Sequence, residues 1–282
     1  MSLYQTVKEY VPQSVQRFTT PMQLWQPGVT PISSTTSVVS MSILYLVVIL
    51  GGQEFMRNRP PVPSRYLKLP FFIHNVLLSL GSGLLLALIL EEVLPFFWAH
   101  GAHDSICRQE VTTKRMMMFY IINYYFKYWE LLDTVFLVLK KKNLMFLHVY
   151  HHMATAALCW SQIVGQTSLA WSIISLNLAV HVVMYGYYAL TSVGIRCPWK
   201  KIITVMQITQ FVLDLGICFW GTYNHYASTY YSKWLPYYRY CHGAPIAAWI
   251  GIGVLTSYLF LFLVFFRKTY NKPKTPSAKK AN

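Results

Sequence analysis

Charge is scarce in this sequence, and acidic charge most of all. Of the 282 residues, 12% are charged, and only 9 are Asp or Glu against 24 Lys or Arg, so the formal net charge is +15. So little charge beside 55% hydrophobic residues excludes an ordinary water-soluble domain. A basic chain could bind nucleic acid, but these basic residues lie between apolar runs and in the tail rather than on one soluble face. We therefore expect a membrane protein with no nucleic-acid partner.

Long apolar runs take the place of the missing charge. Several are long enough to cross a hydrocarbon core about 30 Å thick, and charged, Pro or Gly residues bound each of them. The seven runs cover approximately residues 36–52, 70–98, 116–139, 145–164, 168–190, 202–222 and 244–266. The sequence therefore predicts an all-α protein with seven transmembrane helices, in which segment 1–35 precedes a transmembrane domain 36–266 and a basic tail 267–282 follows it.

The basic residues between these runs are unevenly distributed. Of the 24 Lys and Arg, 16 fall on one side of the predicted membrane, 7 fall on the other, and Lys127 lies within a run. The positive-inside rule then places the amino terminus in the lumen and the carboxyl terminus in the cytosol. Lys279 and Lys280 precede the last two residues, which is the pattern of a dilysine retrieval signal, so we expect the endoplasmic reticulum membrane. The alternative is a basic tail lying on the cytosolic leaflet.

Cysteine is also sparse, with 5 in the chain. The predicted topology places Cys107 and Cys241 in the lumen, Cys197 in the cytosol, and Cys159 and Cys218 within membrane spans. Because the lumen is oxidising, a disulfide between Cys107 and Cys241 is expected, and two free thiols are the alternative.

Ionisable and polar side chains inside the apolar runs are costly in a membrane and need partners. They recur with helical spacing as Lys127, Glu130, Asp133 and Thr134, then His148, His151 and His152, then His181, Met184, Tyr185 and Tyr188, and then Thr204, Gln207, Gln210 and Asp214. At about 1.5 Å of rise per residue, Glu130, His151, His181 and Gln207 lie roughly 8–14 Å from the cytosolic face. Four helices therefore bring polar groups to one layer of the membrane.

Each of these groups also has a purely structural interpretation. Lys127 and Glu130 could form an ion pair, and Gln207 and Gln210 could hydrogen-bond between helices. The tyrosines that follow His181 could belong to an interfacial aromatic belt, and His181 itself could be a satisfied core residue.

The histidine run admits two chemical uses. Membrane desaturases and hydroxylases bind two irons through several histidine boxes, whereas this chain offers one box, His181 and at most His74 on the same side. Zinc needs three or four ligands, and the Lys127 ammonium would oppose a cation in this layer. We therefore expect no metal and favour imidazoles acting as nucleophile and base in a site that excludes water. A metal oxidase and a seven-helix transporter or receptor are the alternatives.

Four segments resemble the signature motifs of one enzyme family. KYWELLDT (127–134), NLMFLHVYHH (143–152), HVVMYGYY (181–188) and TVMQITQ (204–210) are similar, in order, to motifs of the very-long-chain fatty acid elongases, the ELO family of 3-oxoacyl-CoA synthases. The resemblance covers about residues 30 to 270 and is closest to fungal members. It implies that spans 2 to 7 form a closed six-helix barrel around an acyl tunnel, with span 1 outside.

The resemblance also implies the reaction. A long-chain acyl-CoA and malonyl-CoA would condense to a 3-oxoacyl-CoA two carbons longer, with release of CO2 and CoA, through an acyl-histidine intermediate. Both thioesters are substrates, so no cofactor is expected. The expected partners are these two substrates, membrane lipid and the other enzymes of the elongation cycle (ketoacyl reductase, dehydratase and enoyl reductase), and a homo-oligomer is left open.

The family motifs assign roles residue by residue. His151 is the expected nucleophile with His181 opposite, His148 and His152 orient them, and Lys127, Glu130 and Asp133 polarise the site and guide decarboxylation. Substrate contacts are expected from Thr134, Asn143, Met184, Tyr185, Tyr188, Thr204, Gln207 and Gln210.

The cytosolic loops hold basic residues that charge steering would direct to the CoA phosphates, namely Lys140, Lys141, Lys142, Arg196, Lys200 and Lys201. The positive-inside rule alone accounts for them equally well. Chain length would be set where the tunnel closes, around residues 218–250.

Overall fold

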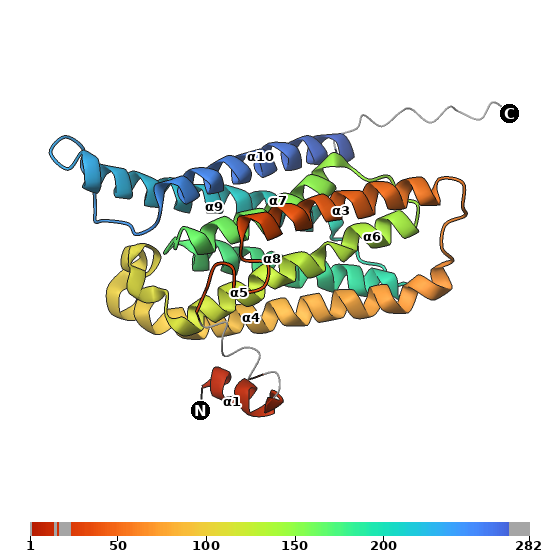
Figure 1. Ribbon diagram of the computed structural model, residues 1–282, viewed down its shortest axis with the longest axis horizontal. Helices are drawn as coiled ribbons and strands as arrows, with labels where there is room; N and C mark the ends of the chain where they lie inside the picture. Colours follow the sequence, from red (N-terminus) through yellow and green to blue (C-terminus); the bar gives the residue numbers. More distant parts are fainter. Residues whose placement is uncertain (1, 14–15, 17–23, 271–282) are drawn as a thin grey trace.

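The computed structural model describes residues 2–13, 16 and 24–270 of the chain. All the regular structure in this described part is helical (Figure 1). The α-helices are α1 (Leu3–Tyr10), α3 (Thr35–Met56), α4 (Ser64–Cys107), α5 (Lys114–Glu130), α6 (Leu132–Leu139), α7 (Phe146–Val164), α8 (Ala170–Ser192), α9 (Lys200–Tyr230) and α10 (Pro245–Tyr270), and a short 3-10 helix, η2, covers Gln109–Val111.

Among the described residues, 5 helices are long and apolar enough to cross a membrane, namely α3, α4, α8, α9 and α10. The chain is therefore a multi-pass helical membrane protein, as its composition predicts. The other two predicted spans correspond to α7, which carries the three-histidine run, and to the pair α5 and α6. Neither is among these five helices.

The predicted span 116–139 is two helices rather than one. The break falls at Leu131, whose amide donates to the carbonyl of Tyr128 at 3.2 Å, while the amide of Thr134 donates to the carbonyl of Leu131 at 3.2 Å. These i to i+3 bonds form a tighter turn than the α-helix. Hydropathy could not locate this break because neither Pro nor Gly marks it. The predicted polar stripe of this span therefore continues from α5 into α6.

Helix α4 is longer than the predicted span 70–98 and has 44 residues. At about 1.5 Å per residue, the length of this helix exceeds the roughly 30 Å thickness of the apolar core of a membrane, so both ends of the helix extend beyond the core. Arg65 and Lys68 near the start and Asp104 near the end lower the local hydropathy without ending the helix. Gly101, with φ of +84°, interrupts the helical backbone near the end.

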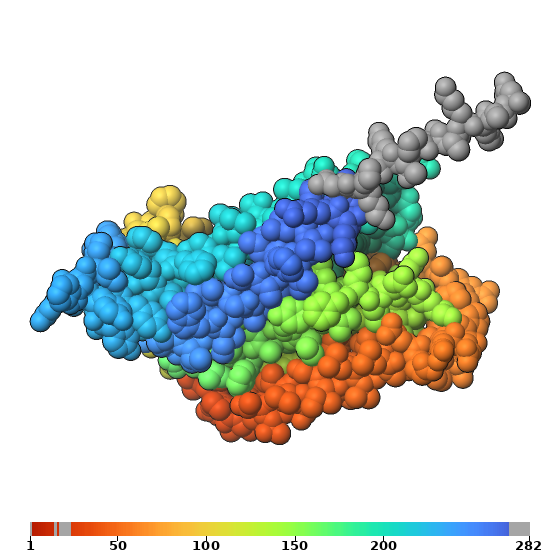
Figure 2. Space-filling view, turned by 90° about the horizontal axis from the view of Figure 1, so that it is seen from above, coloured from red at the N-terminus to blue at the C-terminus, as the bar shows by residue number. Residues whose placement is uncertain are grey.

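The long helices pack in a definite order of neighbours. Helix α4 packs against α8, α8 against α9, α9 against α10, α10 against α7, α7 against α5, and α5 against α4. Helix α3 instead packs against α6 and α7. Figure 2 shows α3 and α10 on one face of the molecule with the α6–α7 segment between them. Each of the helices in this order has neighbours on two sides.

Two apolar clusters and a covalent link hold this arrangement. Leu85 and Ile89 of α4 pack with Phe119 of α5, and a second cluster joins α9 to α10. At the end of the molecule that holds the α9–α10 loop, a disulfide joins Cys107 to Cys241 across 134 sequence positions. The end of α4 is thus tied to the segment that leads into α10.

Candidate active site

A cavity of about 460 Å³ opens among α5, α6, α7, α8, α9 and α10 and holds most of the predicted polar layer. Its lining includes Glu130, Asp133, His148, His151, His152, His181, Met184, Tyr185, Tyr188, Lys200, Thr204, Gln207 and Gln210. The helical spacing of the four motifs therefore directs side chains from different helices to a common space.

A buried ion pair forms one wall of the site. Lys127 is 2% exposed, and its Nζ donates to Glu130 Oε1 at 2.8 Å and to Asn177 Oδ1 at 2.9 Å. Glu130 Oε1 also lies 3.1 Å from His181 Nδ1, and His181 Nε2 lies 3.3 Å from Asn177 Nδ2. An amide nitrogen only donates, so His181 Nε2 accepts and its proton resides on Nδ1, which faces Glu130. The hydrogen bond from Asn177 therefore orients the His181 ring, whose Nδ1 makes no hydrogen bond within the described residues.

Asp133 is the centre of a second network. Its Oδ2 accepts from the hydroxyl of Tyr185 at 2.8 Å, and its Oδ1 lies 2.8 Å from Nε2 of His74, a buried residue. Trp129 Nε1 donates to His74 Nδ1 at 3.1 Å, so His74 Nε2 carries the proton and donates to Asp133. His152 Nε2 lies 4.0 Å from Asp133 Oδ2. From the sequence alone, His74 is only a possible metal ligand, because its partners Asp133 and Trp129 lie in a different predicted span.

His148 and His152 lie side by side, with ring centres 4.5 Å apart. His148 Nε2 hydrogen-bonds with Thr134 Oγ1 at 3.1 Å, and Thr134 in turn hydrogen-bonds with the hydroxyl of Tyr45 at 2.8 Å. His152 is buried, and no described residue hydrogen-bonds with its Nδ1. His148 is therefore held from α6 and α3, while His152 faces the carboxylate of Asp133.

His151 differs from both neighbours. Its ring packs at 4.7 Å from the ring of Tyr258, and within the described chain its imidazole makes no hydrogen bond. Its carbonyl, by contrast, accepts from the hydroxyls of Thr155 at 2.6 Å and Tyr258 at 3.2 Å. The backbone at His151 is fixed while the ring nitrogens remain available.

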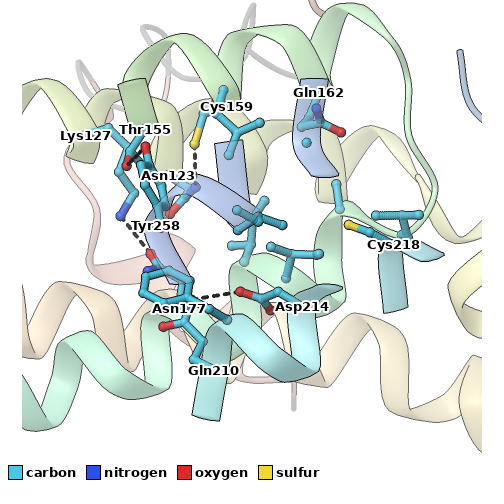
Figure 3. A pocket seen from close by; sticks show the side chains of 18 of the residues that line it. Asn123, Lys127, Thr155, Cys159, Gln162, Asn177, Gln210, Asp214, Cys218 and Tyr258 are labelled. Carbon is cyan, nitrogen blue, oxygen red and sulfur yellow. Dashed lines mark hydrogen bonds between the residues drawn. The ribbon is translucent and has the colours of Figure 1, made fainter. Parts of the chain in front are cut away.

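Figure 3 shows a second, narrower cavity of about 80 Å³. His151 also lines this cavity. Apolar side chains such as Leu158, Ile163 and Leu255 make up most of its wall. The two cavities share four lining residues, namely His151, Asn177, Gln210 and Phe211. His151 therefore stands where a wide polar cavity meets a narrow apolar one.

Of the remaining residues predicted to contact substrate, some line the wide cavity and others do not. Gln207 Nε2 lies 3.4 Å from Met184 Sδ, and Thr204 Oγ1 lies 3.4 Å from the hydroxyl of Tyr270. Thr134 contacts His148 rather than the wide cavity. Asn143 is exposed between α6 and α7 and does not line this cavity.

The six basic residues predicted to meet CoA phosphates have different surroundings. Lys200 lines the wide cavity. Lys140 lies 3.5 Å over the ring of Phe71, Lys201 lies 5.6 Å over the ring of Phe266, and Lys141 donates to two backbone carbonyls after α3 at 3.0 Å each. Lys142 and Arg196 are exposed. The retrieval-signal lysines, Lys279 and Lys280, lie outside the described residues.

Metal donors do not gather in this part of the chain. Among the described residues, no group of three or more His, Cys, Asp or Glu is arranged to hold a metal ion.

The fold and the site define a multi-pass helical membrane protein with a cluster of histidines around a polar cavity, of which His151 also lines a narrower apolar cavity. The chain belongs to the ELO family: residues 30–278 match the profile described as the GNS1/SUR4 family. The resemblance inferred from the four motifs is thereby confirmed.

Named relatives extend this result. The chain is 49% identical over 246 residues to the Schizosaccharomyces pombe protein "Putative fatty acid elongase 1", covering 87% of this chain and 72% of the relative. It is 36% identical over 262 residues to "Fatty acid elongase A" of Dictyostelium discoideum, covering 92% of this chain and 91% of the relative. It is 32% identical over 268 residues to the human "Very long chain fatty acid elongase 4", covering 88% of this chain and 76% of the relative. The chain is thus a fatty acid elongase homologue.

Proposed function

We propose that this chain is the condensing enzyme of fatty acid elongation, a 3-oxoacyl-CoA synthase that joins a long-chain acyl-CoA to malonyl-CoA. The observation that carries the proposal is the position of His151, whose imidazole makes no hydrogen bond within the described chain, at the meeting point of the two cavities. An acyl chain in the narrow apolar cavity brings its thioester to His151, and the CoA portion extends into the wide cavity.

The proposed fold is a closed barrel of six spans with α3 outside. In this arrangement α5 with α6 forms the third of seven spans and α7 forms the fourth. The order of neighbours, in which α4, α8, α9, α10, α7 and α5 each contact the next and α5 contacts α4, supports it. The packing of α3 against α6 and α7 supports its place outside.

In the first half-reaction, a ring nitrogen of His151 attacks the thioester carbonyl. A carbon–nitrogen bond forms, the carbon–sulfur bond breaks, and the CoA thiolate takes up the proton that the acylated ring loses. Imidazole suits this step because it is both a nucleophile and a leaving group. The apolar wall around the chain excludes water, which would otherwise hydrolyse the acyl-imidazole.

In the second half-reaction, malonyl-CoA loses CO2, and the resulting enolate attacks the acyl carbonyl. A carbon–carbon bond forms, the bond to His151 breaks, the released ring nitrogen takes up a proton from water in the wide cavity, and the 3-oxoacyl-CoA leaves. The enolate and the tetrahedral adduct carry negative charge, which fixed hydrogen-bond donors stabilise. Gln207, whose amide makes only a 3.4 Å contact with Met184 Sδ, and Tyr188 line the wide cavity and are the proposed donors, while His181 and Tyr185 shape its wall.

The rest of the proposal concerns the surroundings of the enzyme. The chain resides in the endoplasmic reticulum membrane with its amino terminus in the lumen and its carboxyl terminus in the cytosol, as the loop charges favour. Lys200 meets the CoA phosphates, and the other five basic candidates attract CoA at longer range. The reductases and the dehydratase of the elongation cycle take up the product, and a homo-oligomer is compatible with this arrangement.

Intact-mass analysis tests the covalent step. Purified protein incubated with octadecanoyl-CoA alone is expected to gain the mass of one octadecanoyl group, and later addition of malonyl-CoA is expected to remove it. His151→Ala should abolish the adduct, whereas His100→Ala, which changes an exposed histidine, should retain it. An unchanged adduct in His151→Ala would refute the assignment of the nucleophile, and stoichiometric iron or zinc in active protein would refute the metal-free chemistry.

A further inference from the structure

The narrow cavity contains a buried acid that the proposed reaction does not use. Asp214, on α9, is fully buried and lines this cavity. Its Oδ2 accepts from Gln210 Nε2 at 2.9 Å, while its Oδ1 is buried and has no partner among the described residues. No basic side chain among the described residues forms an ion pair with Asp214. An ionisable group inside a membrane is costly, so an incompletely satisfied one indicates a missing ligand.

A second polar side chain in this cavity also has a buried oxygen without a hydrogen-bond partner. Asn123, on α5, is 2% exposed, and within the described residues its Oδ1 has no hydrogen-bond partner. Its Nδ2 makes only a long contact, 3.8 Å, with the Cys159 sulfur. Figure 3 shows Asn123 with Asn177, Gln210 and Asp214 toward one end of the cavity, and Gln162 and Cys218 toward the other. The unsatisfied oxygens are therefore at the end near the reaction site.

We propose that Asp214, with Gln210 and Asn123, forms a subsite for a hydroxyl group carried by the acyl chain. The inference rests on the proposed function, because it places the acyl chain in this cavity. A plain hydrocarbon chain leaves both buried oxygens unsatisfied, which costs free energy. A chain with one hydroxyl at the right carbon donates its proton to Asp214 Oδ1 and can accept from the Asn123 amide nitrogen, while the rest of the chain covers the apolar wall.

The chemistry of the cavity selects a hydroxyl over other polar groups. A hydroxyl both donates and accepts, so it can pair with Asp214 whether the carboxyl group is ionised or neutral. An ammonium would pair with a carboxylate, but it would have to be buried through an apolar passage at far greater cost.

The geometry of α9 indicates which part of the chain carries the hydroxyl. The ring of Phe211 lies 6.5 Å from the ring of His151, and Asp214 follows Phe211 by three residues, or about one helical turn. Gln210, which bonds to Asp214, lines both cavities. The subsite therefore faces carbons in the half of the chain nearest the thioester.

The test is a positional scan of the hydroxyl. Octadecanoyl-CoA and its singly hydroxylated counterparts, with the hydroxyl moved one carbon at a time along the half nearest the thioester, are elongated with malonyl-CoA, and kcat/KM is measured for each. Wild-type protein should show one preferred position, about tenfold above its neighbours, as one buried hydrogen bond allows. Asp214→Leu should flatten this profile, and Asp214→Asn should retain part of it because the amide still hydrogen-bonds.

Thr222→Val is the matched control. Thr222 lies on the same helix, is buried with an Oγ1 that has no partner among the described residues, and lines a different cavity. Its variant should keep the wild-type profile. The subsite is refuted if wild type shows no preferred hydroxyl position, or if the preferred position persists in Asp214→Leu. In either case the proposed function still holds, provided that wild type elongates octadecanoyl-CoA. If wild type elongates no unsubstituted acyl-CoA of any chain length tested, the proposed function fails and the subsite fails with it.

Discussion

At the scale of single residues, the site depends on a few buried hydrogen bonds that hold charged groups in place. Lys127 donates to Glu130 and Asn177, Asn177 donates to His181, and His74 with Tyr185 holds Asp133. His151 alone of the run faces both cavities. Rigid neighbours around one available imidazole are the arrangement that a nucleophile requires, because held donors and acceptors need no reorganisation during the reaction.

His74→Ala is predicted to lower kcat by about tenfold to a hundredfold with little change in KM. The substitution removes a hydrogen bond to a buried carboxylate, which is worth about 1.5–3 kcal/mol. Steady-state kinetics with varied malonyl-CoA would measure the effect. His74→Gln, which can still donate, should recover part of the loss and serves as the control. Wild-type kcat in His74→Ala would exclude His74 from any role in positioning Asp133.

Lys127→Met is predicted to lower the free energy of unfolding by about 3–5 kcal/mol, because it leaves the Glu130 carboxylate buried without its charged partner. The double variant Lys127→Met/Glu130→Gln removes both charges and should recover much of the stability but not the activity. Thermal unfolding in detergent and an elongation assay separate the two effects. Equal stability of the single and double variants would show that the pair is not coupled.

At the scale of the helices, close contacts depend on small residues that hydropathy does not reveal. Gly165 ends α7, and a Cβ built there would collide with the Cβ of Ala247 in α10. The amide of Ala244 donates to the Gly165 carbonyl at 2.9 Å, so the two chain segments cannot easily move apart. Small residues of this kind allow close packing of helices in a membrane.

Gly165→Ala is accordingly predicted to destabilise the fold by about 1–3 kcal/mol, the usual cost of overpacking. Gly216→Ala is the matched control, since no atom lies within 4 Å of a Cβ built there and Ala is the better helix former. Thermal melting of both variants in one detergent compares them directly. If Gly165→Ala melted at or above the temperature of Gly216→Ala, the close approach of α7 and α10 would be disproved.

The sequence predicts the helices better than it predicts their irregularities. Apolar length and helical spacing locate the runs and place His148, His151 and His181 on one layer, because polar groups in a membrane must face the interior. The break at Leu131 carries no Pro or Gly, so nothing in the residues marks it. His74 was missed as a site residue because its partners, Asp133 and Trp129, come from another part of the chain, whereas Asn177, four positions before His181 on α8, could have been found by the same helical spacing. Only packing reveals a pair such as His74 and Asp133.

At the scale of the whole molecule, distant segments are joined at the end that holds the α9–α10 loop. The Cys107–Cys241 disulfide, the Asp104–Arg239 ion pair at 2.7 Å and the bond from the His242 amide to the Cys107 carbonyl at 2.9 Å all connect the end of α4 to the segment before α10. This link encloses the chain from α5 to α9. It therefore limits how far those helices can separate when the chain unfolds.

Cys107→Ser is predicted to lower the free energy of unfolding by about 2–4 kcal/mol, because a cross-link restricts the unfolded chain and this one spans 134 positions. Cys241→Ser should match it, and the double variant should be no worse than either single one, since all three remove the same bond. Cys197→Ser, which changes a free thiol, is the control.

Unfolding of these variants is measured with and without a reductant. The loss should be present in the oxidised sample and vanish in the reduced one, where wild type also lacks the bond. A deficit that persisted under reduction would mean that packing around Cys107, and not the disulfide, stabilises this end of the molecule.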